Sequence, residues 1–335
     1  MIPLVREYFD RGTPLLEVKN LVREFKSGLY FGISFKAVDD VSFTFEYERP
    51  KILTIAGESG CGKTTLANML LGFLKPTAGL IMYKNKNVFK LSRKEKKWFR
   101  HEVQPIFQDP FETFNPFNRV DYYLMSSALN FNVVKSQREA FEVVDDVLRS
   151  IGINPKNVRG KFPHEFSGGE LQRLSIGRAL ISKPTLLIAD EPVSMVDASL
   201  RIEILNLLVD LNKKFKLSIV YITHDLSTAY YLGAQTSGEI IIIYRGNVIE
   251  QGSIEKVLTS PLHPYTKTLV ESIPPPDPRK KWAISVKPSI LELEEFKMEG
   301  CKFAKRCQYS KDICFKQMPL LKHIGDELVR CWLYN

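Results

Sequence analysis

The spacing of apolar and polar residues along the chain predicts strands and helices that alternate. Apolar and polar residues alternate over residues 15–25 and 41–45, which predicts two strands, and the glycine-bearing residues 26–35 between them predict a loop. The short apolar run KILTIA at residues 51–56 is typical of a buried strand, and a glycine-rich turn then leads into the helical pattern of residues 65–74. The first part of the chain therefore predicts a strand, a loop and a helix in succession.

The same alternation continues through the middle of the chain. Helical spacing of apolar residues covers residues 136–151, 169–180 and 200–215, and the apolar runs at 186–190 and 217–223 predict buried strands. Strands that alternate with helices favour an α/β fold, with a parallel sheet and helices on its faces.

Two features mark the end of this alternation. Residues 240–243 and 247–250, separated by YRG, predict an antiparallel hairpin. The proline cluster IPPPDP at residues 273–278 cannot form a helix or a central strand, so we interpret it as a linker to the last part of the chain.

Composition limits the class of protein without choosing its function. The 335 residues are 44% hydrophobic and 25% charged, which is typical of a globular protein that builds a sizeable core. Lysine and arginine outnumber aspartate and glutamate by 47 to 38, so a nucleotide, a nucleic acid or an anionic lipid surface is an admissible partner. No apolar run is long enough for a membrane-spanning helix, and the first residues do not resemble a signal peptide, which predicts a cytosolic protein.

Residues 57–64, GESGCGKT, match a phosphate-binding loop between the predicted strand and helix. Its glycines let backbone N–H groups converge on nucleotide phosphates, Lys63 adds a point charge, and the Thr64 hydroxyl would ligate Mg²⁺. We expect Cys61 to have no redox role, because a reactive thiol needs exposure or a lowered pKa. The expected nucleotide contacts are Gly57, Glu58, Ser59, Gly60, Cys61, Gly62, Lys63, Thr64 and Thr65.

The strand at residues 186–190 ends in two adjacent carboxylates. Neighbouring side chains at a strand end point in different directions, so the two acids can hold different roles. Asp190 would complete the Mg²⁺ shell, and Glu191 would orient or deprotonate the attacking water. His224 follows the next strand and would bond the γ-phosphate or support Glu191, although a lone histidine at a strand end is more often structural. We expect Lys63, Glu191 and His224 to be the catalytic residues.

FSGGELQR at residues 166–173 resembles the signature motif of ATP-binding-cassette (ABC) proteins. The phosphate loop, LLIADE and THD at residues 223–225 complete the set of motifs in the order typical of that family. The resemblance assigns Gln108 in IFQDP to the Q-loop, which touches Mg²⁺ and the membrane subunit, and Asp197 in SMVD to the D-loop. It also implies an aromatic platform for adenine, for which we favour Phe25 over the alternatives Tyr30 and Phe31.

The resemblance implies the fold and the domain boundaries. The expected fold is an α/β phosphate-loop NTPase cassette with a mixed-sheet core, an antiparallel β subdomain and a helical signature subdomain. We expect the nucleotide-binding domain at residues 14–258, with its helical subdomain at about 109–182, and a small cysteine-rich C-terminal extension at 259–335.

The signature motif implies a site shared between two cassettes. Ser167, Gly168 and Gly169 can present a hydroxyl and backbone donors at a helix start. In ABC proteins these groups face the γ-phosphate held by the opposite subunit, so one chain alone should hydrolyse ATP poorly. Glu170 stands where glutamine is usual, and Val193, Met195 and Val196 also depart from the common pattern, which leaves open whether both composite sites are equally active.

The last part of the chain resembles the segment that follows the cassette in oligopeptide and dipeptide importers, on the residues SPLHPYTKTLVESIPPP at 260–276 and GCKFAKRC at 300–307. This resemblance implies an ATP-hydrolysing importer subunit at the cytoplasmic face of the membrane. The solute would be a peptide, or nickel or an oligosaccharide. The implied partners are a second cassette, which we expect to be a paralogue in a heterodimer, two transmembrane permease subunits and, indirectly, an extracellular solute-binding protein.

Two other classes of ABC protein are the alternatives. A soluble ATPase that acts on nucleic acid or ribosomes is compatible with the net charge of +9. Such proteins generally carry two fused cassettes or coiled-coil insertions, neither of which the sequence shows, so we expect no nucleic-acid partner. An exporter cassette is disfavoured by the oligopeptide-type tail.

Four cysteines, Cys301, Cys307, Cys314 and Cys331, lie in the last 35 residues, separated by five, six and sixteen residues. The cytosol disfavours structural disulfides, so clustered thiols indicate metal or iron–sulfur ligation, and the lack of a CxxC pair weakens zinc. The importer resemblance favours a [4Fe–4S] cluster that cross-links and stabilises the C-terminal segment. Zinc, disulfides of the kind that thermophile proteins contain, free thiols, and a tail that senses iron or redox state remain alternatives.

Overall fold

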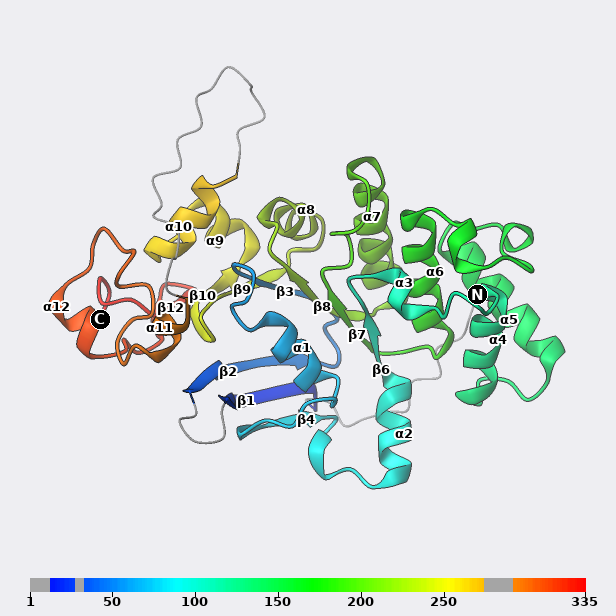
Figure 1. The fold of residues 1–335 in the computed structure, drawn as a ribbon, viewed down its shortest axis with the longest axis horizontal. Helices are drawn as coiled ribbons and strands as arrows, with labels where there is room; N and C mark the ends of the chain where they lie inside the picture. Colours follow the sequence, from blue (N-terminus) through cyan, green and yellow to red (C-terminus); the bar gives the residue numbers. More distant parts are fainter. Residues whose placement is uncertain (1–12, 28–32, 274–291) are drawn as a thin grey trace, which may run out of the picture. The chain divides into compact units, whose positions relative to one another are not determined.

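The computed structural model describes residues 13–27, 33–273 and 292–335, which divide into two compact units (Figure 1). The first unit comprises residues 46–51, 83–221 and the described part of residues 1–14. The second comprises the described parts of residues 15–45, 52–82 and 222–335, and so combines the phosphate loop with the C-terminal region.

The first unit contains the short strand β5, three further strands and most of the helices of the middle of the chain. The strands follow the order β8, β7, β6, and β6 runs parallel to β7 with Val103 opposite Leu186. The predicted strands at 186–190 and 217–223 are confirmed as β7 and β8. The elements are β5 (Lys86–Asn87), η1 (Val88–Lys90), α2 (Arg93–Glu102), β6 (Val103–Ile106), α3 (Pro110–Thr113), α4 (Val120–Asn130), α5 (Gln137–Ser150), η2 (Pro155–Asn157), η3 (Pro163–Glu165), α6 (Gly168–Ile181), β7 (Leu186–Asp190), α7 (Ala198–Phe215) and β8 (Ser218–Thr223), whose last two residues belong to the second unit.

Helices α4, α5 and α6 pack around one apolar core within the first unit (Figure 1). α5 begins at Ser136, whose hydroxyl accepts the Glu139 N–H at 3.2 Å, and residues at helical spacing form its buried stripe. The members of that stripe are Ala140, Val144, Val147 and Leu148. The predicted helices at 136–151, 169–180 and 200–215 are thereby confirmed as α5, α6 and α7.

The second unit contains the C-terminal end of the described chain and nearly all of its first strand. Its strands form two groups, in the orders β2, β1, β4 and β11, β12, β10, β9, β3. β3 and β9 are parallel, and β9 and β10 form the predicted antiparallel hairpin. The elements are β1 (Pro14–Ser27), β2 (Ile33–Glu46), β3 (Ile52–Ala56), α1 (Lys63–Leu70), β4 (Ala78–Tyr83), α8 (Leu226–Thr236), β9 (Glu239–Tyr244), β10 (Asn247–Ser253), α9 (Ile254–Thr259), α10 (Pro264–Glu271), α11 (Glu292–Lys297), α12 (Asp312–Lys316), β11 (Lys322–Ile324) and β12 (Glu327–Val329).

The loop predicted over residues 26–35 is too long. β1 continues to Ser27 and β2 begins at Ile33, because the chain keeps its strand conformation beyond the residues whose alternation is clear. Phe25 and Phe35 lie with ring centroids 5.8 Å apart, so aromatic packing supports this end of the two strands. The predicted linker at 273–278 lies, except for Ile273, outside the described residues.

The C-terminal region joins the core of the second unit rather than standing apart from it. β12 pairs with β10, with Glu250 opposite Val329, and so adds the last hairpin to the sheet. Phe303 is buried in one apolar cluster with residues of β9, α8 and α9, and Cys301 and Cys307 pack against the same cluster. Among the described residues, no helix combines the length and the apolar character needed to cross a bilayer.

Candidate functional site

The phosphate loop lies between a buried strand and a helix, as its sequence predicts. β3 ends at Ala56 and α1 begins at Lys63. Gly62 has φ 110°, and a Cβ there would lie 2.0 Å from the Ala37 carbonyl oxygen, so only glycine fits. No side chain among the described residues caps α1, which leaves the N–H groups of its first turn for an anion.

Lys63 is folded back over the loop. Its Nζ donates to the carbonyl oxygens of Gly57 at 2.8 Å and Glu58 at 2.9 Å, and the residue is only 5% exposed. Binding a triphosphate would exchange these carbonyl contacts for phosphate oxygens. Ser59, Gly60 and Thr64 are exposed, and Gly62 and Thr65 are half-buried, so most of the predicted contacts are accessible.

Cys61 is the buried member of the loop. Its side chain is 1% exposed, and burial raises the pKa of its thiol despite the nearby Lys63 ammonium. A thiol with a raised pKa is a poor nucleophile, which agrees with the prediction that Cys61 has no redox role.

Two residues that hold this loop were missed by the sequence analysis. The Glu58 carboxylate forms two hydrogen bonds with the Arg306 guanidinium, at 2.9 and 3.0 Å. The Glu58 N–H donates to the Tyr265 hydroxyl at 2.9 Å. Both partners lie more than 200 positions away in the chain. No local motif signals such contacts, although Arg306 lies within the GCKFAKRC segment that carries the importer resemblance.

His224 lies between the end of β8 and the start of α8. The turn is fixed by its neighbours, because the Asp225 N–H donates to the Thr223 hydroxyl and the Ser227 N–H donates to the Asp225 carboxylate, both at 2.9 Å. The His224 side chain is exposed. Its predicted role toward the γ-phosphate stays a prediction.

The two carboxylates after β7 lie in the first unit, and both are half-buried. Glu191 has φ 46°, in the left-handed region that a non-glycine residue rarely adopts. Its carbonyl oxygen accepts hydrogen bonds from the Ser194 N–H at 3.2 Å and the Ser194 hydroxyl at 2.9 Å, which hold the turn. Glu191 is one of ten described non-glycine residues with positive φ, so its assignment rests on the motif, and the backbone geometry shows only that it lies in a tight turn.

The signature motif forms the first turn of α6. Ser167 is the N-cap, and the Glu170 carboxylate accepts both the Ser167 N–H at 2.9 Å and the Ser167 hydroxyl at 3.0 Å. A Cβ at Gly169 would lie 2.7 Å from the end of the Leu200 side chain of α7, so α6 and α7 pack closely at this glycine. Ser167, Gly169 and Glu170 line one pocket together with Arg173.

The Q-loop and D-loop residues also lie in the first unit. Gln108 is exposed, and its loop is tied to α6 because Gln172 donates to the Phe107 carbonyl oxygen at 3.2 Å. Asp197 is exposed at the N-terminus of α7. The signature helix and the Q-loop are thus one connected structure.

Phe25, the favoured adenine platform, is half-buried in β1 beside Arg23, whose guanidinium lies 4.7 Å from its ring centroid. The alternatives Tyr30 and Phe31 lie outside the described residues. The assignment of the adenine platform therefore stays a prediction.

The four C-terminal cysteines, Cys301, Cys307, Cys314 and Cys331, are all free thiols and line one pocket. Burial and the neighbouring thiols together raise the pKa of Cys301 to about 12. The Cys314 sulfur accepts the Lys311 N–H at 3.4 Å. The backbone N–H groups of Phe303, Tyr309 and Leu333 partly offset the burial that raises the thiol pKa of Cys301, Cys307 and Cys331. The disulfide alternative is not seen in this arrangement.

His263 lines the same pocket. It is 1% exposed, and its Nδ1 accepts the Tyr265 N–H at 3.0 Å, which leaves the neutral ring's proton on Nε2. That Nε2 atom is buried and has no hydrogen-bond partner among the described residues.

Within residues 13–27, 33–273 and 292–335, no group of three or more His, Cys, Asp or Glu side chains is arranged to hold a metal ion. The predicted Mg²⁺ ligands, Thr64, Gln108 and Asp190, therefore stay predictions, and so does the [4Fe–4S] cluster. A cluster spreads its ligands over four irons, so its thiolates lie farther apart than thiolates that share one ion.

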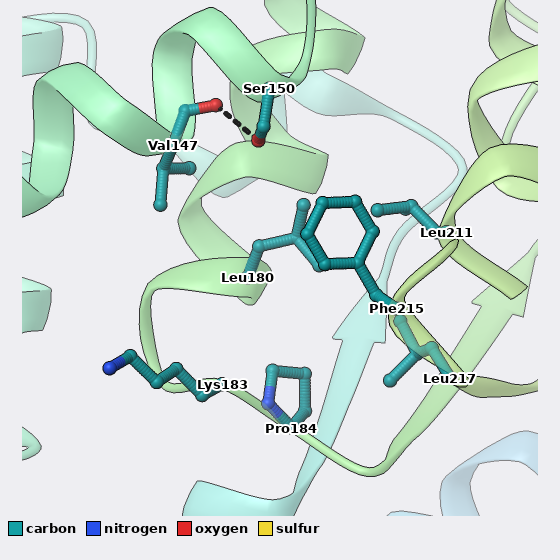
Figure 2. Close-up of a pocket in the computed structure, with 8 residues that line it drawn as sticks. All are labelled: Val147, Ser150, Leu180, Lys183, Pro184, Leu211, Phe215 and Leu217. Atoms are coloured by element: carbon teal, nitrogen blue, oxygen red, sulfur yellow. Dashed lines mark hydrogen bonds between the residues drawn. The ribbon is translucent and has the colours of Figure 1, made fainter. Parts of the chain in front are cut away.

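A further pocket in the first unit contains none of the predicted site residues (Figure 2). It is lined mainly by apolar side chains, including Leu180 and Phe215, and the Ser150 hydroxyl on its rim donates to the Val147 carbonyl oxygen at 2.7 Å. Because the Ser150 proton is used in this hydrogen bond and most of the lining is apolar, we do not assign this pocket a catalytic role.

Comparison with known protein families gives two matches along the chain. Residues 38–194 match the family described as ABC transporter, and residues 249–314 match the family described as Oligopeptide/dipeptide transporter, C-terminal region. The second match covers the segment that begins in β10 and ends at Cys314.

Curated relatives match nearly the whole chain. The chain is 35% identical to the oligopeptide transport ATP-binding protein AppF of Bacillus subtilis (strain 168), over 96% of this chain and 98% of that protein. It is 34% identical to the di/tripeptide transport ATP-binding protein DppF of Pseudomonas aeruginosa (strain UCBPP-PA14), over 95% of this chain and 97% of that protein.

Solved structures share the fold. The dimeric ATP-binding cassette MJ0796 bound to ADP and Pi superposes with a TM-score of 0.62 at 24% identity, over 71% of this chain and 98% of that chain. CbiO1 from Clostridium perfringens, part of the ABC transporter complex cbiONQ, has a TM-score of 0.62 at 27% identity, over 74% of this chain and 92% of that chain. The expected cassette fold is confirmed.

Proposed function

Because this chain belongs to the ABC transporter ATP-binding proteins of the oligopeptide and dipeptide type, we propose that it hydrolyses ATP to power the import of peptides. One observation carries the proposal: a phosphate loop and a signature helix occur on the same chain as the oligopeptide-type C-terminal region. The relatives' names give the solute class, which is oligopeptides for the Bacillus protein and di/tripeptides for the Pseudomonas protein. Nickel and oligosaccharides are the alternative solutes.

Nucleotide binding would use the loop before α1. The N–H groups of the first turn and the helix dipole attract the phosphates, and the Lys63 ammonium adds a full charge once it leaves the Gly57 and Glu58 carbonyl oxygens. Phe25 would stack on the adenine. These roles follow from the motif and are supported by the strand, loop and helix around it.

Hydrolysis would depend on the residues after β7 and β8. Glu191 would take the proton of the attacking water, and His224 would hold the γ-phosphate or support Glu191. Hydroxyl, amide and carboxylate oxygens suit Mg²⁺, so Thr64, Gln108 and Asp190 are a chemically matched ligand set. Bound Mg²⁺ would offset the negative charge of the phosphates.

The working unit would contain a second cassette. Ser167, Gly168 and Gly169 lie at the start of α6, where a hydroxyl and N–H groups favour an anion, and they would meet the γ-phosphate bound by the partner. Asp197 would contribute at the same interface. We propose a paralogous partner, and hence a heterodimer, because importers of the oligopeptide and dipeptide type usually pair two different cassettes.

The family implies a membrane complex. We propose that two permease subunits bind this chain at the cytoplasmic face, with Gln108 in the segment that responds to both nucleotide and permease. A solute-binding protein would deliver peptide from outside the cell. The chain would therefore be a peripheral membrane protein, and no nucleic acid would take part.

We propose that a [4Fe–4S] cluster occupies the cysteine pocket. Four free thiols line one pocket, the Cys314 sulfur accepts the Lys311 N–H at 3.4 Å, and the buried His263 Nε2 donor has no acceptor among the described residues. These donors suit the negative charge of a thiolate-bound cluster. When bound, the cluster would cross-link the chain from Cys301 to Cys331. Zinc and free thiols are the alternatives.

Purification from membranes tests the proposed function. Detergent-solubilised, affinity-tagged protein is expected to recover two hydrophobic subunits and a second cassette, and peptide-loaded solute-binding protein is expected to raise the ATPase rate. Glu191→Gln should abolish that stimulated rate, while Glu142→Gln, on an exposed face of α5, should not. Recovery with ribosomes or nucleic acid and without permeases would support the soluble ATPase instead.

A further inference from the structure

Glu58 of the phosphate loop is held at three separate points. Its N–H donates to the Tyr265 hydroxyl at 2.9 Å, and its carbonyl oxygen accepts the Lys63 ammonium at 2.9 Å. Its carboxylate accepts two hydrogen bonds from Arg306, Nη1 to Oε2 at 3.0 Å and Nη2 to Oε1 at 2.9 Å. Two of these three contacts come from residues beyond the cassette motifs.

The Glu58–Arg306 contact has the geometry of a strong ion pair. Both nitrogens of the guanidinium fork meet both carboxylate oxygens, which fixes orientation as well as distance. The Arg306 side chain is 8% exposed and that of Glu58 is 29% exposed, so solvent screens the pair only in part. Tyr265 is fully buried and offers a rigid acceptor.

Arg306 is itself held by buried groups. Its Nη1 also donates to the Tyr244 hydroxyl at 3.2 Å, and its guanidinium lies over the rings of Tyr244 and Phe303. The Tyr244 hydroxyl donates to Glu295 at 2.8 Å, and Glu295 also accepts Arg245 Nε at 2.8 Å. The network connects α11 and β9 to the phosphate loop, so the Arg306 fork has little freedom to move.

We propose that Arg306 is a positioning residue for nucleotide binding, which holds Glu58, and with it the backbone of the phosphate loop, in the orientation that receives the phosphates. Lys63 must leave the Glu58 carbonyl oxygen to reach a phosphate, and the Arg306 and Tyr265 contacts keep Glu58 in place when it does. The C-terminal extension is thereby part of the ATP-binding unit. The proposal rests on ATP binding at this loop.

Both supports of Glu58 arise next to the cysteine pocket. Arg306 directly precedes Cys307, and Tyr265 donates its N–H to His263, which lines the pocket. A structural change in the cysteine pocket can therefore reach Glu58 in two ways, through Cys307 and Arg306 or through His263 and Tyr265.

A double-mutant cycle on the full-length protein tests the proposal. Affinity for Mg-ATP is measured with a fluorescent ATP analogue in wild type, Arg306→Ala, Glu58→Ala and the double variant. Each single change is expected to weaken affinity by about tenfold, and the double change by no more than the larger single effect, because both remove the same contact. In the assembled transporter, KM for ATP should rise with little change in kcat.

Lys305→Ala is the matched control, because Lys305 is the neighbouring residue and pairs with the exposed Glu294. It should leave Mg-ATP affinity unchanged. Arg306→Lys keeps the positive charge but lacks the two parallel N–H donors of the guanidinium. Glu58→Gln removes the negative charge of Glu58 and leaves Arg306 unchanged. These two variants replace Arg306→Ala in the test if Arg306→Ala is unstable.

Wild-type affinity in Arg306→Ala, or effects of the two single changes that multiply in the double variant, would overturn the proposal. Mg-ATP affinities of Arg306→Lys and Glu58→Gln that lie between those of the wild type and the alanine variants support the proposal. Wild-type affinity in both variants overturns it. If wild-type protein binds no Mg-ATP at all, the proposed function fails rather than this inference.

Discussion

Glu170 reaches back over the first turn of α6, where its carboxylate accepts the Ser167 hydroxyl at 3.0 Å. The same carboxylate accepts the Ser167 N–H at 2.9 Å. The signature groups that are proposed to meet a phosphate are therefore already bonded to an anion, and that anion offsets the positive end of the helix dipole.

Replacing this anion should favour closure of the two cassettes on ATP. Glu170→Gln keeps a carbonyl oxygen for the Ser167 bonds but removes the negative charge that opposes a phosphate. We expect ATP-dependent association with the partner cassette to strengthen several-fold, measured by sedimentation velocity.

Glu165→Gln is the matched control for this change, because the Glu165 carboxylate makes the same kind of bond to the Phe162 N–H at 2.7 Å. It should leave association unchanged. Weaker association in Glu170→Gln would show that the carboxylate is needed rather than inhibitory.

Lys63→Ala and Glu191→Gln should separate binding from hydrolysis. Lys63→Ala removes the ammonium from the loop and should weaken Mg-ATP affinity itself. Glu191→Gln should retain affinity but lower ATP turnover in the assembled transporter by at least about a hundredfold, which traps a closed dimer. Near-normal turnover in the glutamine variant would remove Glu191 as the base.

Gly62→Ala should abolish nucleotide binding through backbone geometry alone. A Cβ at Gly62 would meet the Ala37 carbonyl oxygen at 2.0 Å, so the loop must move. Gly325→Ala is the control, because Gly325 also has positive φ, at 61°, but has no neighbour that a Cβ would meet. The control should lose about 1 kcal/mol of stability and keep ATP affinity. Normal binding by Gly62→Ala would show that the loop adapts.

Anaerobic purification tests the occupant of the cysteine pocket. We expect about four irons and four acid-labile sulfides per chain, and their loss in Cys314→Ser. If the occupant acts on the loop through Arg306 and Tyr265, loaded and cluster-free protein should differ in Mg-ATP affinity. Zinc at one equivalent, or colourless and iron-free protein, would exclude the cluster. Equal affinities would leave it purely structural.

His101 predicts a pH dependence of folding in the first unit. Burial lowers the pKa of its imidazole below the usual 6.5, so the unfolded chain binds the proton more readily than the folded one. Stability is then complete above pH 6.5 and falls as the pH drops toward the folded pKa. Urea unfolding midpoints of wild type should fall between pH 7.5 and 5.5 by more than those of His101→Gln. Equal changes would mean that His101 does not contribute.

Local patterns predicted the elements of the cassette well because each is encoded by a short run of residues. β7 occupies the residues expected of it, and α5 and α6 differ from their predicted ranges by one residue at each end. The ends of β1 and β2 were missed because a glycine-bearing segment looks like a loop until its partner strand is known. α2 was missed because it is strongly charged and buries only Phe99.

The motifs located the loop, the carboxylates and the signature, but not what supports them. The left-handed conformation of Glu191 depends on three-dimensional geometry that no composition reveals, whereas the capping bonds of Glu170 follow the Ser-x-x-Glu spacing that is typical of a helix start. Arg306 was even less visible, because its partner Glu58 is remote in sequence and an arginine beside a cysteine has no characteristic pattern.

Glu58 and Arg306 are 248 positions apart in the chain. During synthesis the phosphate loop leaves the ribosome long before residue 306, and β10 is also made before β12, the strand with which it pairs. A nascent or truncated chain can thus contain every nucleotide-binding motif and still lack the contacts that orient the phosphate loop. Acquisition of full ATP affinity would then mark completion of the polypeptide, which keeps unfinished copies from competing for nucleotide and permeases.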